Sequence, residues 1–262
     1  MGSLAGKSPA STYKSLLKVV DETNGVSSLI SRIEDGEGTA SCLYISDDQL
    51  QILPQNDDTT TAFQVKNTSG ARLLIVDTTN NLVKTGTTAT PANTQILEYT
   101  AQGLVPAAGT HYFVTKGTGQ YVTLNGIPEL TNGTGTDPET TYSGGATTDD
   151  LITNLFLVPI NLTIDAVKFM VSTTTDTDTT INVHLYSYDI KNVGATNDGL
   201  LTNGTLLANG QATSVDRNCI KTVTCTIDSA SVSANKVIAC FVENETNTNS
   251  IMLNTQVLYH FD

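Results

Sequence analysis

Residues 63–86 read FQVKNTSGARLLIVDTTNNLVKTG, and this stretch decides the fold class. Short runs of apolar residues alternate in it with Asn, Asp, Gly and Thr, which are typical of tight turns. The pattern predicts three short strands, FQVK, RLLIV and LVK, separated by two turns. RLLIV carries apolar side chains on both faces of its strand, so both faces need cover.

The same layout occurs once before, in residues 29–53. LISRIE, SCLYIS and LQIL are the predicted strands there, and DGEG and DD are the turns between them. Gly38 and Gly70 close equivalent turns 32 residues apart. Glycine supplies the positive φ that such a turn needs. Self-similarity at a fixed spacing indicates a repeat architecture.

These repeats lack the means to bury their own apolar residues. Strands of four or five residues are marginal in isolation, and two repeats are fewer than a solenoid normally needs. Residues 21–86 contain no helix pattern that could cover the strands. We therefore expect several copies of the chain to associate around a symmetry axis, with the polar turns facing outward.

The chain changes character after residues 85–94, TGTTATPANT, which predict a linker. About ten strand candidates follow, and alternation is clearest in INVHLYSY, where Ile181, Val183 and Leu185 share one face. Strands without helices predict a β-sandwich or jelly roll. The long loop at 125–152 is of the kind that is functional or mobile. The other strand candidates are QILEY, HYFVTK, QYVTL (120–124), TNLFLVPI, AVKFMVS, GTLLA, CIKTVTCTI, KVIACFVE and SIMLNTQVLYHF.

The charge distribution excludes some partners. The 262 residues include 13 basic and 26 acidic ones, and such an acidic chain lacks the basic surface that nucleic acid requires. No apolar run is long enough for a signal peptide or a membrane span. Residues 1–20 have three lysines and no acid, which fits a plain basic tail or an arm that docks on an acidic surface. Within this region, TYKSLLKVV (12–20) favours a strand over a helix.

No catalytic or metal-binding pattern is found in the sequence. His111, His184 and His260 have no short ligand spacing between them, so we expect no metal and no cofactor. His184 and His260 lie in predicted strands, where a hydrogen-bonded or solvent-exposed histidine is the ordinary interpretation. Asp176 and Asp178 could bind calcium but are more typical of a solvated turn.

The four cysteines show no CxxC spacing. Their spacing fits four small buried thiols, with a disulfide between Cys219 and Cys225 as the alternative. Three tyrosines, Tyr112, Tyr121 and Tyr142, lie beside or within the long loop. If these rings are exposed to solvent, they could stack on sugars. The alternative is that they pack on their own sheet.

Several stretches resemble fibre and appendage proteins of tailed bacteriophages, especially marine podoviruses. They are residues 63–86, quoted above, YKSLLKVVDETNGVSSLISRIEDGEGTASCLYIS (13–46), LVPAAGTHYFV (104–114) and LFLVPINLTIDAVKFMVS (155–172). The two repeats are fewer than in long tail fibres, which favours a head fibre or a short tail fibre.

The resemblance implies a homotrimer in the virion, made in the bacterial cytoplasm, with no enzymatic activity. It implies an extended anchoring arm (1–20), an intertwined trimeric β shaft (21–90) and a jelly-roll tip (91–262). The partners would be a capsid or tail protein and a host cell-surface polysaccharide, bound at the tip through Tyr112, Tyr121 and Tyr142. The residues expected to attach the arm are Leu4, Lys7, Pro9, Tyr13, Lys14 and Leu16.

Two other functions remain open at this point. One is a capsid cement protein that decorates the shell and contacts no host. The other is a polysaccharide depolymerase, which would need carboxylates clustered in a groove and usually a much longer β-helix.

Overall fold

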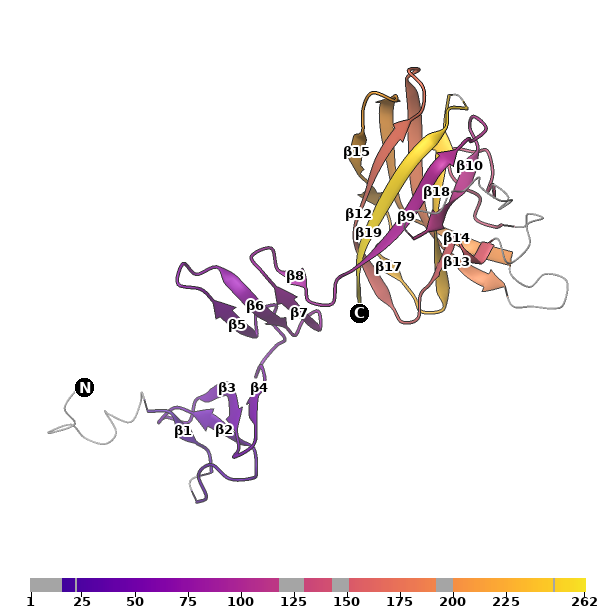
Figure 1. The fold of residues 1–262 in the computed structure, drawn as a ribbon. Coiled ribbons are helices and arrows are strands. Elements are labelled where there is room, and N and C mark those ends of the chain that lie inside the picture. The colour runs from indigo at the N-terminus through magenta and orange to yellow at the C-terminus, as the bar shows by residue number, and fades with distance from the viewer. Residues whose placement is uncertain (1–15, 22, 118–129, 143–150, 192–199, 247) are drawn as a thin grey trace. The chain divides into compact units, whose positions relative to one another are not determined.

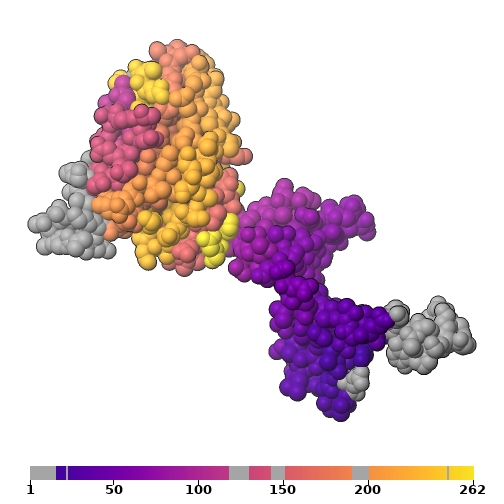
Figure 2. Space-filling model, turned by 180° about the vertical axis from the view of Figure 1, so that it is seen from behind, coloured from indigo at the N-terminus to yellow at the C-terminus, as the bar shows by residue number. Residues whose placement is uncertain are grey.

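A computed structural model describes residues 16–21, 23–117, 130–142, 151–191, 200–246 and 248–262. The chain divides into two compact units, Met1–Ala92 and Asn93–Asp262, here called the N-terminal and C-terminal units. Figures 1 and 2 show them from opposite sides. The predicted all-β class is confirmed, since the named elements in the described residues are all strands. No helix in this part of the chain is long and apolar enough to cross a membrane.

The N-terminal unit contains two small antiparallel sheets built alike (Figure 1). The strands recur with the 32-residue spacing: β2 and β5 begin at Ser31 and Phe63, and β3 and β6 begin at Ala40 and Arg72. The predicted repeat is therefore present in the structure. The strands are β1 Lys18–Val19, β2 Ser31–Glu34, β3 Ala40–Ile45 and β4 Leu50–Ile52 in the first sheet, and β5 Phe63–Lys66, β6 Arg72–Asp77, β7 Leu82–Thr85 and β8 Thr90–Pro91 in the second.

Turn chemistry fixes this repeat. Gly38 and Gly70 have φ of 85° and 82°, a region that residues with a Cβ rarely adopt. Three residues before each glycine, a side-chain oxygen caps the turn: Asp35 Oδ1 accepts from Thr39 N at 2.8 Å, and Asn67 Oδ1 accepts from Ala71 N at 2.9 Å.

The strand boundaries differ from expectation at both ends of the unit. Only Lys18–Val19 forms a strand within the described part of 12–20. Residues 85–94 are not wholly a linker, because β8 pairs with β7. Pairing with an existing edge makes a strand of residues whose own propensity is low.

The C-terminal unit is one large, nearly closed antiparallel sheet. Its strands follow the order β15-β12-β19-β9-β10-β18-β13-β14-β16, with β11 beside β18 and β17 beside β12. The predicted strand HYFVTK coincides with β10, just as FQVK in the N-terminal unit coincides with β5. The predicted QYVTL strand lies outside the described residues. The bounds are β9 Gln95–Leu104, β10 His111–Lys116, β11 Leu155–Leu157, β12 Leu162–Thr173, β13 Thr179–Lys191, β14 Leu200–Val215, β15 Lys221–Thr224, β16 Thr226–Ile227, β17 Ser231–Val232, β18 Lys236–Asn244 and β19 Ile251–Phe261.

One short segment joins the two edges of this sheet. β15 pairs with β12, and β16, which follows one residue later, pairs with β14. The intervening Cys225 is buried, and its backbone N donates to Val167 O at 2.9 Å. A Cβ on Gly210 of β14 would lie 2.8 Å from Cys225 Sγ and 3.1 Å from Phe169 of β12. The absence of a side chain at Gly210 is what lets the edges approach.

Alternation along the strands creates two apolar layers. Ile181, Val183 and Leu185 face inward, as predicted, and join the inner core of the sheet. Tyr186 and Tyr188 point to the opposite face and belong to a second cluster, the outer layer. The outer layer consists of Phe113, Leu130, Tyr142, Leu151, Tyr186, Tyr188, Leu201, Val237, Ala239 and Phe241.

Residues 130–142, here called the covering segment, close the outer layer. Phe113 N donates to Leu130 O at 2.9 Å, and Tyr142 N donates to Leu201 O at 2.9 Å. The buried Asn132 donates through Nδ2 to Glu139 O and to the hydroxyl of Tyr188, at 2.9 and 3.0 Å. This part of the long 125–152 loop is therefore a packed cover.

Candidate metal centre

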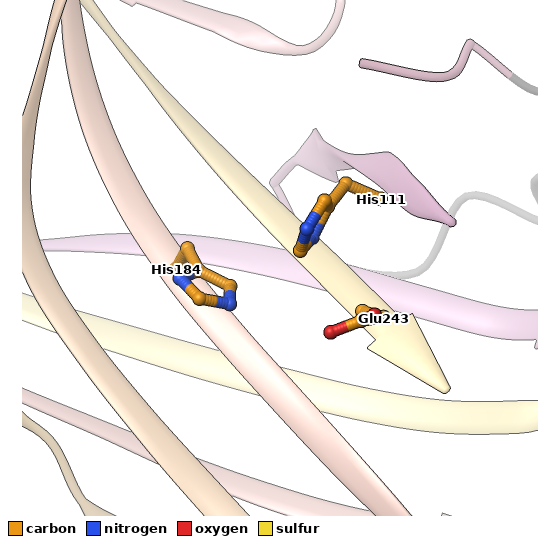
Figure 3. A group of neighbouring side chains, drawn as sticks. All are labelled: His111, His184 and Glu243. Atoms are coloured by element: carbon orange, nitrogen blue, oxygen red, sulfur yellow. The ribbon is translucent and has the colours of Figure 1, made fainter. Parts of the chain in front are cut away.

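Three neighbouring strands bring His111, His184 and Glu243 together. His111 of β10 lies opposite Glu243 of β18, and Asn182 of β13 lies on the other side of Glu243. His184 follows Asn182 by two residues, so all of these side chains share the outer face of the sheet. Figure 3 shows the two rings and the carboxylate turned toward one another.

The cluster is almost sealed from solvent. His111, His184 and Glu243 are 0%, 6% and 5% exposed, and one potential ligand atom from each lies within 4.8 Å of the others. The ring centres of the histidines are 5.1 Å apart, with the planes at 89°. Histidines and a carboxylate at this spacing are the ligand types found in zinc and non-haem iron sites.

Three ring nitrogens in the cluster have no hydrogen-bond partner among the described residues. They are His111 Nδ1 and both nitrogens of His184. A buried polar atom without a partner costs about 1–3 kcal/mol, and buried polar groups are normally satisfied. The expected hydrogen-bonded or exposed state of His184 is therefore wrong, because its strand position turns it under the covering segment.

The surroundings hold each side chain in place. His111 Nε2 lies 2.9 Å from Gly135 O, a carbonyl that can only accept, so Nε2 carries the proton and Nδ1 has a lone pair. Asn182 Nδ2 donates to Glu243 Oε2 at 2.8 Å, and Gln211 Nε2 donates to Asn182 Oδ1 at 3.0 Å. These two hydrogen bonds hold the Glu243 carboxylate in place.

His184 is held in its neutral form. Burial and, to a lesser degree, the proximity of His111 lower its pKa to about 4, although Asp137 acts in the opposite direction. Asp137 Oδ1 lies 3.5 Å from His184 Nδ1. A neutral ring keeps a lone pair at neutral pH, which is the state that a metal ligand requires.

A surface pocket of about 400 Å³ reaches the cluster from one side. His184, Asn182 and Asp137 line it together with Gln211 and Glu245. The pocket gives water-sized species a route to the His184 ring.

Sequence patterns missed this cluster because its members lie far apart in the chain. Only the register of β10, β18 and β13 brings them together. The available signal was the position of His184 on the face opposite Ile181, Val183 and Leu185, which removes it from the inner core.

The tyrosines expected to bind glycans are buried where they are described. Tyr112 is 7% exposed, and its hydroxyl accepts from Ala107 N at 3.0 Å. Tyr142 is 5% exposed and packs edge-on against Phe113 with ring centres 5.2 Å apart. Neither ring offers an open face to a sugar, and Tyr121 lies outside the described residues.

Of the residues expected to attach the arm, only Leu16 is described. Its side chain is exposed. The other members of that set, Leu4, Lys7, Pro9, Tyr13 and Lys14, lie outside the described residues.

The remaining candidates have ordinary partners. All four cysteines are free thiols, so the alternative bridge is absent; Cys225 and Cys240 are buried as expected, but Cys42 is exposed. Asp176 pairs with Arg217 at 2.6 Å. His260 Nδ1 lies 3.0 Å from Asp165.

Comparison with known proteins adds no family to this picture, since no family model and no curated protein matches the chain.

Proposed function

We propose that this protein is a homotrimeric virion appendage whose shaft is formed by the N-terminal unit. The observation that carries the proposal is the lack of a core in that unit: among its described residues, Ile75 is the only apolar side chain that is fully buried. The large apolar residues that it exposes are Leu16, Leu17, Val20, Val26, Leu29, Ile30, Leu50, Leu53, Phe63, Val65, Leu73 and Val83.

One face of the second sheet carries five apolar residues, none of them buried. Phe63 pairs with Val76, which pairs in turn with Val83. Val65 and Leu74 form the next pair on the same face. Phe63, Val65 and Val83 are exposed and the other two are half-buried. Contiguous exposed apolar surface of this kind marks an interaction site.

The first sheet has a face of the same character. Leu43 pairs with Ile52 and Ile45 pairs with Leu50, and none of the four is buried. The opposite face carries Tyr44 and Gln51. Both repeats leave an apolar face uncovered. We propose that the same sheets from two further copies of this chain cover these faces, with the three copies related by a threefold rotation axis.

The C-terminal unit has an uncovered apolar region of its own. The outer layer covers the β10-β18-β13-β14 half of the sheet, whereas Met170 and Met252, on β12 and β19, are exposed. They line a groove of about 480 Å³ together with Ile220. We assign this groove to the same self-association.

In the proposed assembly, the residues that precede β1 form the extended arm that anchors to a capsid or tail protein, and the C-terminal unit forms a jelly-roll tip displayed from the virion. The tip would contact host polysaccharide through a surface other than the buried rings of Tyr112 and Tyr142. Three tips on one shaft would strengthen weak binding, because the second contact is intramolecular. The proposal includes no catalytic step.

Two measurements test the proposal. Native mass spectrometry of the full chain should give three copies, and a monomer at micromolar concentration would overturn the shaft. Deleting residues 2–12 should leave the trimer intact and prevent its incorporation into particles. Normal incorporation of the truncated chain would refute the anchor.

The burial of Tyr112 and Tyr142 gives weight to a second candidate, a capsid cement protein without a host contact. Particles with and without the protein distinguish the two. Loss of a cement protein lowers the temperature at which the shell opens, whereas loss of a receptor-binding appendage lowers adsorption to cells.

A further inference from the structure

We infer that His111, His184 and Glu243 form a binding site for one Zn²⁺-class ion, ligated by His111 Nδ1, His184 Nε2 and a Glu243 carboxylate oxygen. The proposal is independent of the trimer, because all three residues belong to one chain and one unit.

The hydrogen bonds select the ligand atoms. His111 Nε2 donates to Gly135 O, which leaves Nδ1 as the free nitrogen. Asp137 Oδ1 lies 3.5 Å from His184 Nδ1. We therefore assign the other ring nitrogen, Nε2, as the atom that ligates the ion. In metal sites, a ligating histidine generally donates its other N–H to a carbonyl or carboxylate. Gly135 O fills this role for His111, the Asp137 carboxylate lies 3.5 Å from His184 Nδ1 without a hydrogen bond, and Asn182 holds the ligating carboxylate.

The donor set also selects the class of ion. Two neutral imidazoles and one carboxylate suit zinc and its transition-metal neighbours, whereas calcium and magnesium prefer sites made of oxygen ligands. A dication would balance the charges of Glu243 and Asp137 and would use ring nitrogens that otherwise lack partners. Three protein ligands leave a fourth position for water or a small ligand, and the pocket beside His184 gives access to it.

Zinc chloride and the untagged full chain are sufficient for the test. A Cys42→Ser background removes an exposed thiol that could bind zinc independently. Isothermal titration should give one zinc per chain. Glu243→Gln, which retains an acceptor for Asn182, should weaken binding at least tenfold, and His184→Gln should abolish it.

His260→Gln is the matched control. It removes the third histidine, which pairs with Asp165, and should leave zinc affinity unchanged. All variants are compared by circular dichroism and thermal melting in EDTA, so that loss of binding is separated from loss of fold. Equal zinc affinity in Glu243→Gln and the parent chain, or no binding by the parent chain, overturns the assignment.

A measurement on the parent chain covers the case in which a variant does not fold. In ¹⁵N NMR spectra of the imidazole rings, zinc should shift the nitrogens of two histidines and leave those of the third in place. Shifts in all three rings, or in none, contradict the site. Neither outcome bears on the oligomeric state, so failure here is distinguishable from failure of the proposed appendage.

Discussion

Leu50→Lys is the sharpest test of a shaft that depends on neighbouring copies. Leu50 lies on the apolar face of the first sheet and is 69% exposed in one chain. A lysine there removes little from the isolated chain, because most of the leucine surface is already in water. If two further copies cover this face, however, the substitution places a charge in each interface.

The magnitude follows from the exposed fraction. Full burial of a leucine side chain contributes about 1.5–3 kcal/mol, and roughly two thirds of that remains to be gained by Leu50 on assembly. The loss is then about 1–2 kcal/mol per copy and about 3–6 kcal/mol per trimer. At 1.4 kcal/mol per factor of ten, the association constant should fall about 10²–10⁴-fold.

Gln51→Lys is the matched control, because Gln51 follows Leu50 on the same strand and points to the opposite face. Sedimentation equilibrium over a hundredfold range of concentration compares both variants with the parent chain. We expect Leu50→Lys to dissociate and Gln51→Lys to remain assembled. Equal association constants for the two variants would refute the reasoning, since the apolar face would then not be the interface.

Three further changes test other parts of the molecule. Gly204→Ala places a methyl group 2.6 Å from a ring carbon of Tyr188, and this overpacking should destabilise the C-terminal unit by about 1–3 kcal/mol; an unchanged melting temperature would contradict the packing. Tyr188→Phe removes the hydroxyl that accepts from Asn132 at 3.0 Å, and urea denaturation should show a loss of about 1–3 kcal/mol, whereas an undiminished midpoint would mean that water replaces the hydroxyl. Burial opposes ionisation of Asp77, but hydrogen bonds from Lys84 and Asn80 prevail and lower its pKa to about 2. Because this pKa lies below the unfolded value of about 3.8, the stabilisation is complete above about pH 4 and is lost as the pH falls toward 2. Asp77→Asn should therefore flatten the acid dependence of unfolding in the N-terminal unit, and an unaltered dependence would assign it to other carboxylates.

Local chemistry explains which parts of the fold could be predicted from the sequence. The 32-residue repeat was predictable because glycine adopts positive φ without steric cost, as Gly38 and Gly70 do in equivalent turns. The inward face of β13 was predictable because alternation alone separates Ile181, Val183 and Leu185 from their neighbours. Jelly-roll connectivity, the arm and the trimer stay predictions.

The other features of the fold and of the candidate site depend on pairing between residues far apart in the chain, and a single sequence does not show which residues pair. Residues 90–91 form the strand β8 because they pair with the edge of β7. Tyr142 reads as a loop tyrosine, yet it is buried because the covering segment folds back on β14. The metal cluster depends on strand register, and a slip of one residue in β13 would turn His184 into the inner core.

The two units obtain their stability from different sources, and this explains where each proposed function lies. The C-terminal unit nearly closes its sheet and buries two apolar layers within a single chain. Such a packed scaffold can hold in place even those ring nitrogens that lack hydrogen-bond partners, which favours a preorganised metal site. The N-terminal unit exposes most of its apolar side chains. Under the two proposals, metal binding therefore lies in the nearly closed sheet, whereas assembly uses the repeats together with the groove lined by Met170 and Met252.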